Sequence, residues 1–247
     1  MRARFDAKGD VIVVTGGANG IGRALARAAA QAGARVVVCD VDAAAMAALS
    51  SVAGISTRRL DVSDRAAVFD VLGGVEREFG KIDGLVCAAA IQPRLPVHEM
   101  EEATWERVLR TNLDGVVWSY QAVVAGMIAR RSGSIVAFTS GLAQQGWPEA
   151  SAYAASKAAL IAFAKSAAKE IARHRVRFNL VAPGVIDTPQ YRAANAGADD
   201  ARWRASVGVG QPDDVVGALL FLLSDQATMT ASIISRDFAY PAEAPDR

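Results

Sequence analysis

Three residues of this sequence have types and a spacing that could move a proton: Ser140, Tyr153 and Lys157. A Tyr phenol keeps its proton up to a pKa of about 10, so it is a poor base at neutral pH. A Lys four residues further along a helix lies on the same face. At an effective dielectric of about 20, its charge ~4 Å away would lower the phenol pKa by roughly three units. With Ser140 holding the same reacting oxygen, the trio predicts acid–base chemistry at an alcohol or carbonyl.

Each member of the trio also has an ordinary explanation. Ser140 could cap local backbone at the end of a strand, and Lys157 could be a solvated charge on a helix. A Tyr and a Lys at this spacing arise by chance often enough that the pair needs support from the rest of the chain.

A glycine-rich turn near the N-terminus supplies part of that support. It follows the apolar run Val11–Thr15 and precedes an Ala-rich helical stretch. Glycines there permit a tight turn and a close approach of the backbone to a pyrophosphate, whose charge the free N–H groups of the helix would favour. The cofactor contacts predicted in this turn are Gly16, Asn19, Gly20, Ile21 and Gly22.

The carboxylate of Asp40, at the end of the second predicted strand, favours NAD over NADP. It can accept hydrogen bonds from both ribose hydroxyls and would repel the extra phosphate of NADP. Val41 stands where a phosphate-binding Arg would be expected. Asp40 could instead cap the next helix, a role that Asp42 could also fill. Asp61 and Val62 close the third strand and are expected at the adenine edge.

Short apolar runs alternate with helical patterns along the chain, as in a parallel sheet built from βα units. The predicted strands are Val11–Thr15, Arg35–Asp40, Thr57–Leu60, Leu85–Ala89, Ser134–Ser140 and Arg177–Ala182. The predicted helices are Ile21–Gln31, Ala43–Val52, Asp64–Phe79, Trp105–Ala129, Ala154–Ala172 and Pro212–Leu223. We expect one α/β domain over residues 1–247, with a doubly wound, Rossmann-like parallel sheet covered by helices on both faces.

Two irregular segments, 92–102 and 187–210, leave from the carboxyl ends of strands, where open parallel sheets bind ligands. They are candidates for the substrate rim and for a lid, or else they are ordinary solvent loops. Arg94 could pair with a substrate carboxylate or be merely solvated. The side chains of Trp147 and Trp203 suggest an apolar or cyclic substrate group. The predicted rim residues are Gln92, Arg94, Leu142, Gln144, Gln145, Trp147, Tyr191 and Trp203.

Taken together, these motifs resemble the short-chain dehydrogenase/reductase family, over a stretch from Val11 to about Asp237. The family motif T-G-x-x-x-G-x-G matches Thr15 to Gly22, and its Y-x-x-x-K pair matches Tyr153 and Lys157. The catalytic Ser at the end of the fifth strand matches Ser140.

The resemblance implies further roles. Asn112 would be catalytic, holding a water that connects Lys157 to solvent, although it could also be a polar residue inside a helix. Lys157 would also reach the nicotinamide ribose, and Thr188 would lie near the carboxamide. The cofactor contacts implied in this part of the chain are Ala88, Tyr153, Lys157, Pro183, Gly184, Val185 and Thr188.

Three departures from the family pattern limit what can be transferred. The N-A-G after the fourth strand is Ala88-Ala89-Ala90, and a Gly near the C-terminus is Ala231. The D-G-G that follows is Asp237-Phe238-Ala239. Because Phe238 cannot readily adopt the positive φ of a Gly, we expect the end of the chain to take a different path.

Composition narrows the remaining classes. A net charge of +1 gives no electrostatic case for nucleic acid or an anionic membrane surface. The N-terminus lacks an apolar signal region, and no uncharged stretch would span a bilayer. Cys39 and Cys87 suggest buried, reduced strand cysteines and a cytoplasmic location. His98 and His174 stand far apart without partners at ligand spacing, so no metal is expected.

The stretch 112–129 is apolar around most of its circumference. Such a helix is buried on more than one side, either in a subunit contact of a homodimer or homotetramer or under a neighbouring helix of the same chain.

The sequence therefore predicts an NAD-dependent oxidoreductase that interconverts a secondary alcohol and its ketone by hydride transfer, with Tyr153 as general acid and base. A cyclic or aromatic alcohol is the leading substrate class, ahead of a sugar or a cis-diol. Two alternatives stay open: a non-catalytic NAD-binding module, and an NADPH-dependent reductase of keto or acyl groups.

Overall fold

The computed structural model describes residues 4–196 and 208–236, which form one seven-stranded sheet of parallel strands in the order β3-β2-β1-β4-β5-β6-β7. This topology confirms the predicted doubly wound α/β fold, with the switch in strand order between β1 and β4. The strands are β1 (Val11–Thr15), β2 (Arg35–Asp40), β3 (Ile55–Arg59), β4 (Gly84–Cys87), β5 (Gly133–Phe138), β6 (Val176–Ala182) and β7 (Ile233–Ser235).

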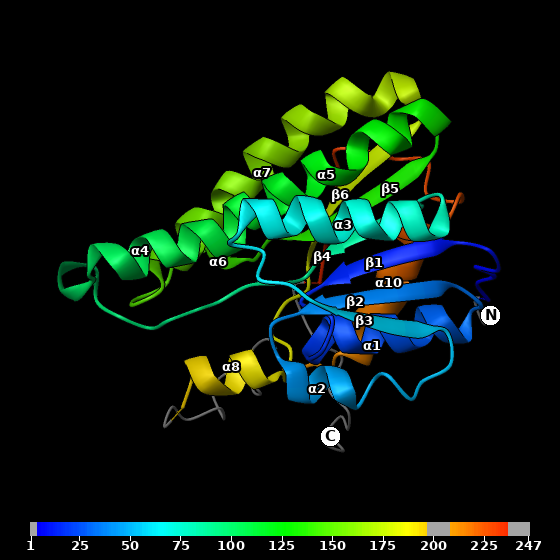
Figure 1. Cartoon of the computed structure of the whole chain (residues 1–247). Coiled ribbons are helices and arrows are strands. Elements are labelled where there is room, and N and C mark those ends of the chain that lie inside the picture. The colour runs from blue at the N-terminus through cyan, green and yellow to red at the C-terminus, as the bar shows by residue number, and fades with distance from the viewer. Residues whose placement is uncertain (1–3, 197–207, 237–247) are drawn as a thin grey trace, which may run out of the picture.

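Helices cover both faces of the sheet, as Figure 1 shows. The central strands are apolar on both sides because each side packs under helices; every residue of β1 is buried. One face carries α3 (Arg65–Phe79), α5 (Gly115–Arg130) and α7 (Ser151–Ile171), and the other carries α1 (Gly20–Gln31), α2 (Ala43–Ala47) and α10 (Asp213–Leu223).

The remaining helical segments lie near the carboxyl ends of the strands or join the main elements. In Figure 1, α4 (Glu102–Leu109), α6 (Leu142–Gln145) and α8 (Pro189–Ala194) are on the left, where the strands end. These segments are η1 (Val97–Glu99), α4 (Glu102–Leu109), η2 (Arg110–Asp114), α6 (Leu142–Gln145), η3 (Ala172–His174) and α8 (Pro189–Ala194).

The long helix predicted over 105–129 is wrong in one respect, because the structure interrupts it with the π-helical turn η2. This turn carries Asn112, whose side chain is completely buried and bonded to groups outside the helix. Helical propensity and apolar spacing gave no sign of this interruption, which depends on contacts with residues distant in sequence.

The other differences from the predicted elements are local. The second predicted helix ends at Ala47 instead of Val52, because the N–H of Leu49 turns back to the carbonyl of Met46 at 2.9 Å. The strand β7 was not predicted, since its three residues are too few to form a pattern. Asn179 helps to fix this edge, since its amide bonds the backbone of Met229 and Ser232.

The glycine turn after β1 packs directly on the backbone that follows β4. Gly16 has φ of 67°, and a Cβ there would lie 2.3 Å from the backbone nitrogen of Ala89. Only glycine meets both conditions. The turn that faces the expected cofactor is thereby joined to the segment Ala88-Ala89-Ala90.

Ala231 keeps a left-handed backbone conformation, with φ of 61°, although it has a side chain. Its N–H donates to the carbonyl of Phe178 at 2.9 Å, which holds the segment in place beside β6. An L-residue in this conformation is strained by roughly 1–2 kcal/mol. Residues 237–239, for which we expected an altered path, lie outside the described part of the chain.

Candidate active site

A cavity of about 1040 Å³ opens at the carboxyl ends of the strands. It is lined by the glycine turn after β1, the ends of β2 to β6 and the first turns of α7. All residues predicted to contact the cofactor border it: Gly16, Asn19, Gly20, Ile21, Gly22, Asp40, Asp61, Val62, Ala88, Tyr153, Lys157, Pro183, Gly184, Val185 and Thr188.

Tyr153 lies in the first turn of α7 and Ser140 just beyond β5, so two elements bring the hydroxyls together. Burial raises the pKa of the Tyr153 phenol above its ordinary value. A hydrogen bond with the Ser140 hydroxyl lowers the pKa in turn, and so does the charge of Arg94. The Ser140 oxygen also accepts the N–H of Leu142 at 3.2 Å, which fixes the hydroxyl at the cavity wall.

Lys157 is a buried cation, not the solvated helix charge that the sequence left open. Its ammonium donates to the carbonyl of Phe138 at 2.8 Å and lies 5.7 Å from the centre of the Tyr153 ring. Burial lowers the pKa of Lys157 to about 8, and the nearby Cys87 opposes this shift.

The pKa of Tyr153 in the protein alone is therefore raised, and the lowered pKa predicted from the sequence is wrong. That prediction assumed that the charge of Lys157 dominates the pKa of Tyr153 and brings it down. Burial dominates instead, and the groups that lower the pKa of Tyr153 are Ser140 and Arg94. The error has a physical cause, because spacing along a helix says nothing about desolvation, which disfavours both the phenolate and the ammonium.

Asn112 holds the active-site backbone together through its buried amide. Its Oδ1 accepts the N–H of Ile91 at 2.8 Å, and its Nδ2 donates to the carbonyl of Ile91 at 2.9 Å and to Ser156 Oγ at 3.1 Å. The Ser156 hydroxyl in turn donates to the carbonyl of Tyr153 at 2.7 Å. The loop after β4 and the start of α7 are thus joined through one side chain, a connection that sequence analysis missed.

Asp40 is oriented by backbone donors before any ligand binds. One carboxylate oxygen accepts the N–H of Ala18 at 2.9 Å and the other accepts the N–H of Asp42 at 3.0 Å. Both oxygens keep acceptor capacity toward the cavity. Asp42, not Asp40, caps α2, since its side chain accepts the N–H of Ala45 at 2.9 Å.

The N-terminus of α1 fits a pyrophosphate. Asn19 occupies the cap position, yet its side chain makes no capping hydrogen bond and donates to Asp42 at 3.0 Å. Gly20, Ile21 and Gly22, in the first turn, border the cavity, where a positive helix end and free N–H groups favour an anion. Together with the oriented carboxylate of Asp40, this arrangement fits a dinucleotide.

On the substrate side, the described residues of the predicted rim border the same cavity, with one exception. Gln144 is exposed and is not part of the lining. Trp203 lies outside the described residues. The structure adds Asn195, at the end of α8, which lies in the predicted segment 187–210 but was not among the predicted rim residues. The lining residues are Gln92, Arg94, Leu142, Gln145, Trp147 and Tyr191.

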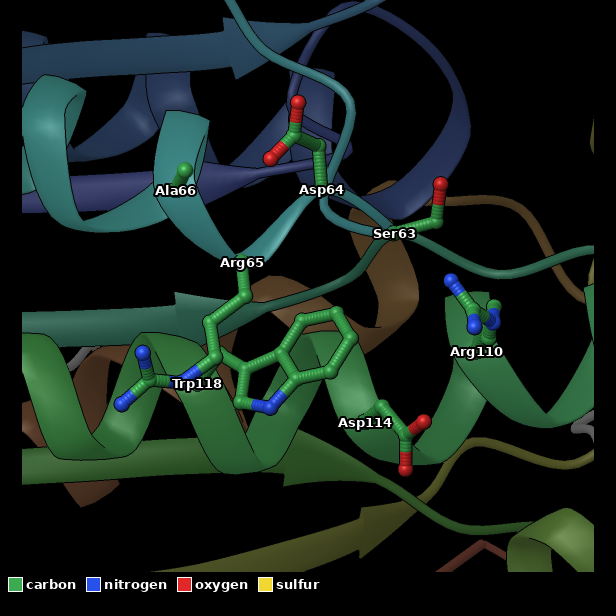
Figure 2. Close-up of a pocket in the computed structure, with 7 residues that line it drawn as sticks. All are labelled: Ser63, Asp64, Arg65, Ala66, Arg110, Asp114 and Trp118. Atoms are coloured by element: carbon green, nitrogen blue, oxygen red, sulfur yellow. The ribbon is translucent and has the colours of Figure 1, made fainter.

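A second hollow, of about 550 Å³, lies where α3 and α5 begin. Figure 2 shows Arg65 extending from the start of α3 toward Trp118 on α5. The Asp64 carboxylate caps α3 by accepting the N–H of Ala67 at 3.1 Å, and the Arg65 guanidinium stacks 4.4 Å from the centre of the Phe69 ring. None of the residues predicted to be catalytic or to bind the cofactor lines this hollow, so it is not the candidate active site.

Cys39 and Cys87 are buried free thiols, as predicted, and burial raises the pKa of each to about 12. Within residues 4–196 and 208–236, no three His, Cys, Asp or Glu side chains are arranged to hold a metal ion. No described helix has both the length and the hydrophobicity needed to cross a bilayer.

Comparisons with known proteins found a matching family model, related sequences and a similar solved structure. The family model described as short chain dehydrogenase matches residues 10–199. The galactitol 2-dehydrogenase of Agrobacterium fabrum is 36% identical over 230 residues, covering 87% of this chain and 90% of that protein. The cis-4-hydroxycyclohexanecarboxylate dehydrogenase of Sinomonas cyclohexanicum is 36% identical over 240 residues, covering 94% and 96%. The crystal structure of gox2181 superposes with a TM-score of 0.86 at 35% identity, covering 94% of this chain and 95% of that one.

The buried ammonium predicts a pH-dependent stability. Between pH 8 and 10.5 the folded protein holds Lys157 uncharged while the unfolded chain still holds it charged, so its contribution to the free energy of unfolding rises with pH. Relative to Lys157→Met, the wild type should gain about 3 kcal/mol across this window. Urea unfolding of both proteins at pH 7, 8, 9 and 10 measures the difference. Stability curves that stay parallel would contradict the depressed pKa.

Proposed function

The chain belongs to the short-chain dehydrogenase/reductase family, and on that premise we propose that it is an NAD-dependent dehydrogenase that oxidises a secondary alcohol, preferably a cyclic one. As a member of this family it is an oxidoreductase that uses a nicotinamide cofactor, NAD or NADP, on a small-molecule substrate. The proposed NAD-dependent alcohol oxidation rests on one observation. Asp40, the glycine turn and the hydroxyl-bearing residues Ser140 and Tyr153 all line the same cavity.

The proposed roles follow from the chemistry of each side chain. The bound nicotinamide would supply the acceptor or donor of a hydride. Tyr153 takes up the hydroxyl proton in oxidation and returns it in reduction, while Ser140 holds the substrate oxygen within hydrogen-bonding reach. Lys157 stabilises the phenolate once it forms, and Asn112 fixes the backbone on both sides of the reacting centre.

The raised pKa of Tyr153 bears on the direction of the reaction. At neutral pH the phenol of the protein alone carries its proton, which suits it to donate that proton to a carbonyl. Oxidation needs the phenolate, so alkaline pH should favour alcohol oxidation over ketone reduction. The dinucleotide site supports a redox role in either direction.

A cyclic substrate is supported by the lining and by one relative. Leu142 and Trp147 give the substrate end of the cavity apolar surface. The related dehydrogenase of Sinomonas cyclohexanicum is named for a hydroxycyclohexane acid, and the Agrobacterium fabrum relative for a sugar alcohol. We further propose that residues 1–247 act as one domain and that residues 187–210 form the lid of the cavity. Residues 197–207 of this segment lie outside the described part of the chain.

Tyr153→Phe tests the chemical role. We expect kcat for a panel of cyclic secondary alcohols, followed by NADH absorbance, to fall by roughly 10²-fold or more, because acid–base catalysis is lost. The dissociation constant for NAD should stay within about threefold. The matched control is Tyr120→Phe, since Tyr120 packs between Phe163 and Phe178 in the core, away from the lining.

Comparable turnover in Tyr153→Phe would exclude the assigned base. A wild-type protein that binds NAD but oxidises none of these alcohols, and reduces none of their ketones, would instead support a non-catalytic NAD-binding module.

Asp40→Asn tests the choice of cofactor. The amide keeps the shape of the side chain but removes its charge, so repulsion of the NADP phosphate is lost. We expect the wild type to bind NADH at least roughly tenfold more tightly than NADPH, and the variant to lose most of this ratio. Fluorescence titration with both cofactors measures it. Tighter binding of NADPH by the wild type would favour the alternative of an NADPH-dependent reductase.

We also propose that the protein is a homodimer or homotetramer, with α5 at a subunit contact. Val117, Trp118 and Val124 on this helix remain half-buried within the single chain. Pairing with a second copy would remove more of their apolar surface from water. Light scattering at micromolar concentration should give a mass of at least twice 25.9 kDa; a monomer mass would exclude this proposal.

A further inference from the structure

Arg94 places a guanidinium with spare hydrogen-bonding capacity at the substrate end of the cavity. It is half-buried, in the loop after β4, and burial lowers its pKa, which reports the cost of removing the charge from water. Its hydrogen bonds are long: 3.3 Å to the carbonyl of Pro148 and 3.4 Å to Asn195 Oδ1. Among the salt bridges of residues 4–196 and 208–236, none includes Arg94.

Another half-buried arginine of the same chain shows the contrast. Arg130 donates at 2.8 Å to the Glu76 carboxylate and at 2.8 Å to the carbonyl of Ile82. Short, charge-assisted bonds of this kind are what a partly desolvated guanidinium requires. Arg94 has five N–H donors and makes two long bonds to neutral oxygens, and no carboxylate of the described residues lies within salt-bridge distance of it.

Arg94 also lies close to the candidate catalytic residues. Its side chain borders the cavity that Tyr153 and Ser140 also border. It is close enough to Tyr153 that each group shifts the pKa of the other. Glu149 interacts with the guanidinium only at a distance and does not line the cavity. An anion bound to Arg94 would therefore lie within one small molecule's length of the reacting hydroxyl.

We propose that Arg94 binds a carboxylate of the substrate, so that the substrate is a hydroxy acid and the product the corresponding oxo acid. This inference rests on the proposed dehydrogenase function and adds the charge of the substrate to it. A guanidinium matches a carboxylate through two parallel N–H···O bonds, which fix orientation as well as position. The apolar body of the acid would lie against Leu142 and Trp147, which line the same space.

The binding test compares two ligands that differ in charge and little else, cyclohexanecarboxylate and cyclohexanecarboxamide. Calorimetric titrations are made with the full chain, with and without saturating NAD. The wild type should bind the carboxylate at least roughly tenfold more tightly than the amide, since hydrogen bonds to a charged partner are the stronger ones. In Arg94→Gln the ratio should fall to about one, while in Arg94→Lys it should fall only in part.

Arg107→Gln is the matched control, because Arg107 is an exposed arginine on α4 that borders the same cavity. It should keep the preference for the carboxylate. Unchanged binding of NAD by Arg94→Gln would show that this variant is folded. A missing preference in the wild type, a preference retained in Arg94→Gln, or one lost in Arg107→Gln would each overturn the assignment to Arg94.

Kinetics separate this inference from the proposed function. The substrates are 3- and 4-hydroxycyclohexanecarboxylate and their carboxamides, with kcat/KM followed by NADH absorbance. For at least one acid, Arg94→Gln should lower kcat/KM, chiefly through KM, at least roughly tenfold more than it lowers kcat/KM for the matching amide. The amide loses only the influence of the Arg94 charge on the pKa of Tyr153. Turnover without any preference for acids would contradict the proposed carboxylate site and still support the proposed dehydrogenase function. Selective binding of carboxylates without any turnover would do the reverse.

Discussion

The hydrogen bond between the buried ammonium of Lys157 and the carbonyl of Phe138 is the interaction on which the rest of the site depends. A charged amine removed from water is costly unless it is paired or hydrogen-bonded. Here the carbonyl of Phe138, at the end of β5, accepts a hydrogen bond from one of the three N–H groups of the ammonium. The same strand end is held to α7 a second time, because the Thr139 hydroxyl donates to the carbonyl of Lys157 at 3.1 Å. The distance between strand and helix is therefore fixed, and with it the approach of Ser140 to Tyr153.

The second fixed point is the amide of Asn112, which makes three hydrogen bonds in the interior. An amide buried with all of its partners present is favourable, whereas one lost partner would leave a donor or acceptor without a bond. The π turn presents Asn112 to Ile91 on one side and to Ser156 on the other. The π turn interrupts the regular backbone hydrogen bonds that an unbroken α-helix would have kept. We attribute this interruption to the connection that Asn112 makes. Residues from three distant segments share one rigid wall as a result.

The sequence was sufficient for the fold and for the location of the cavity, because both depend on local patterns. Apolar runs of β-branched residues mark buried parallel strands, and parallel strands place their carboxyl ends together. It was insufficient for the pKa of Tyr153, since desolvation depends on the packing of the whole chain and not on the spacing to Lys157. Nor could it find the contacts of Arg94, whose partners Pro148 and Asn195 stand 54 and 101 residues away.

In the proposed reaction, Arg94 would connect the charge of the substrate to proton transfer. In the protein alone, its charge is one of two influences that lower the pKa of the Tyr153 phenol. A carboxylate bound to the guanidinium would cancel much of that influence, because the phenol would then face a neutral pair. The phenol would hold its proton more strongly with an acid bound than with a neutral alcohol. Binding of a hydroxy acid to Arg94 would thus make oxidation of that acid more dependent on Lys157, the remaining cation close to the Tyr153 ring.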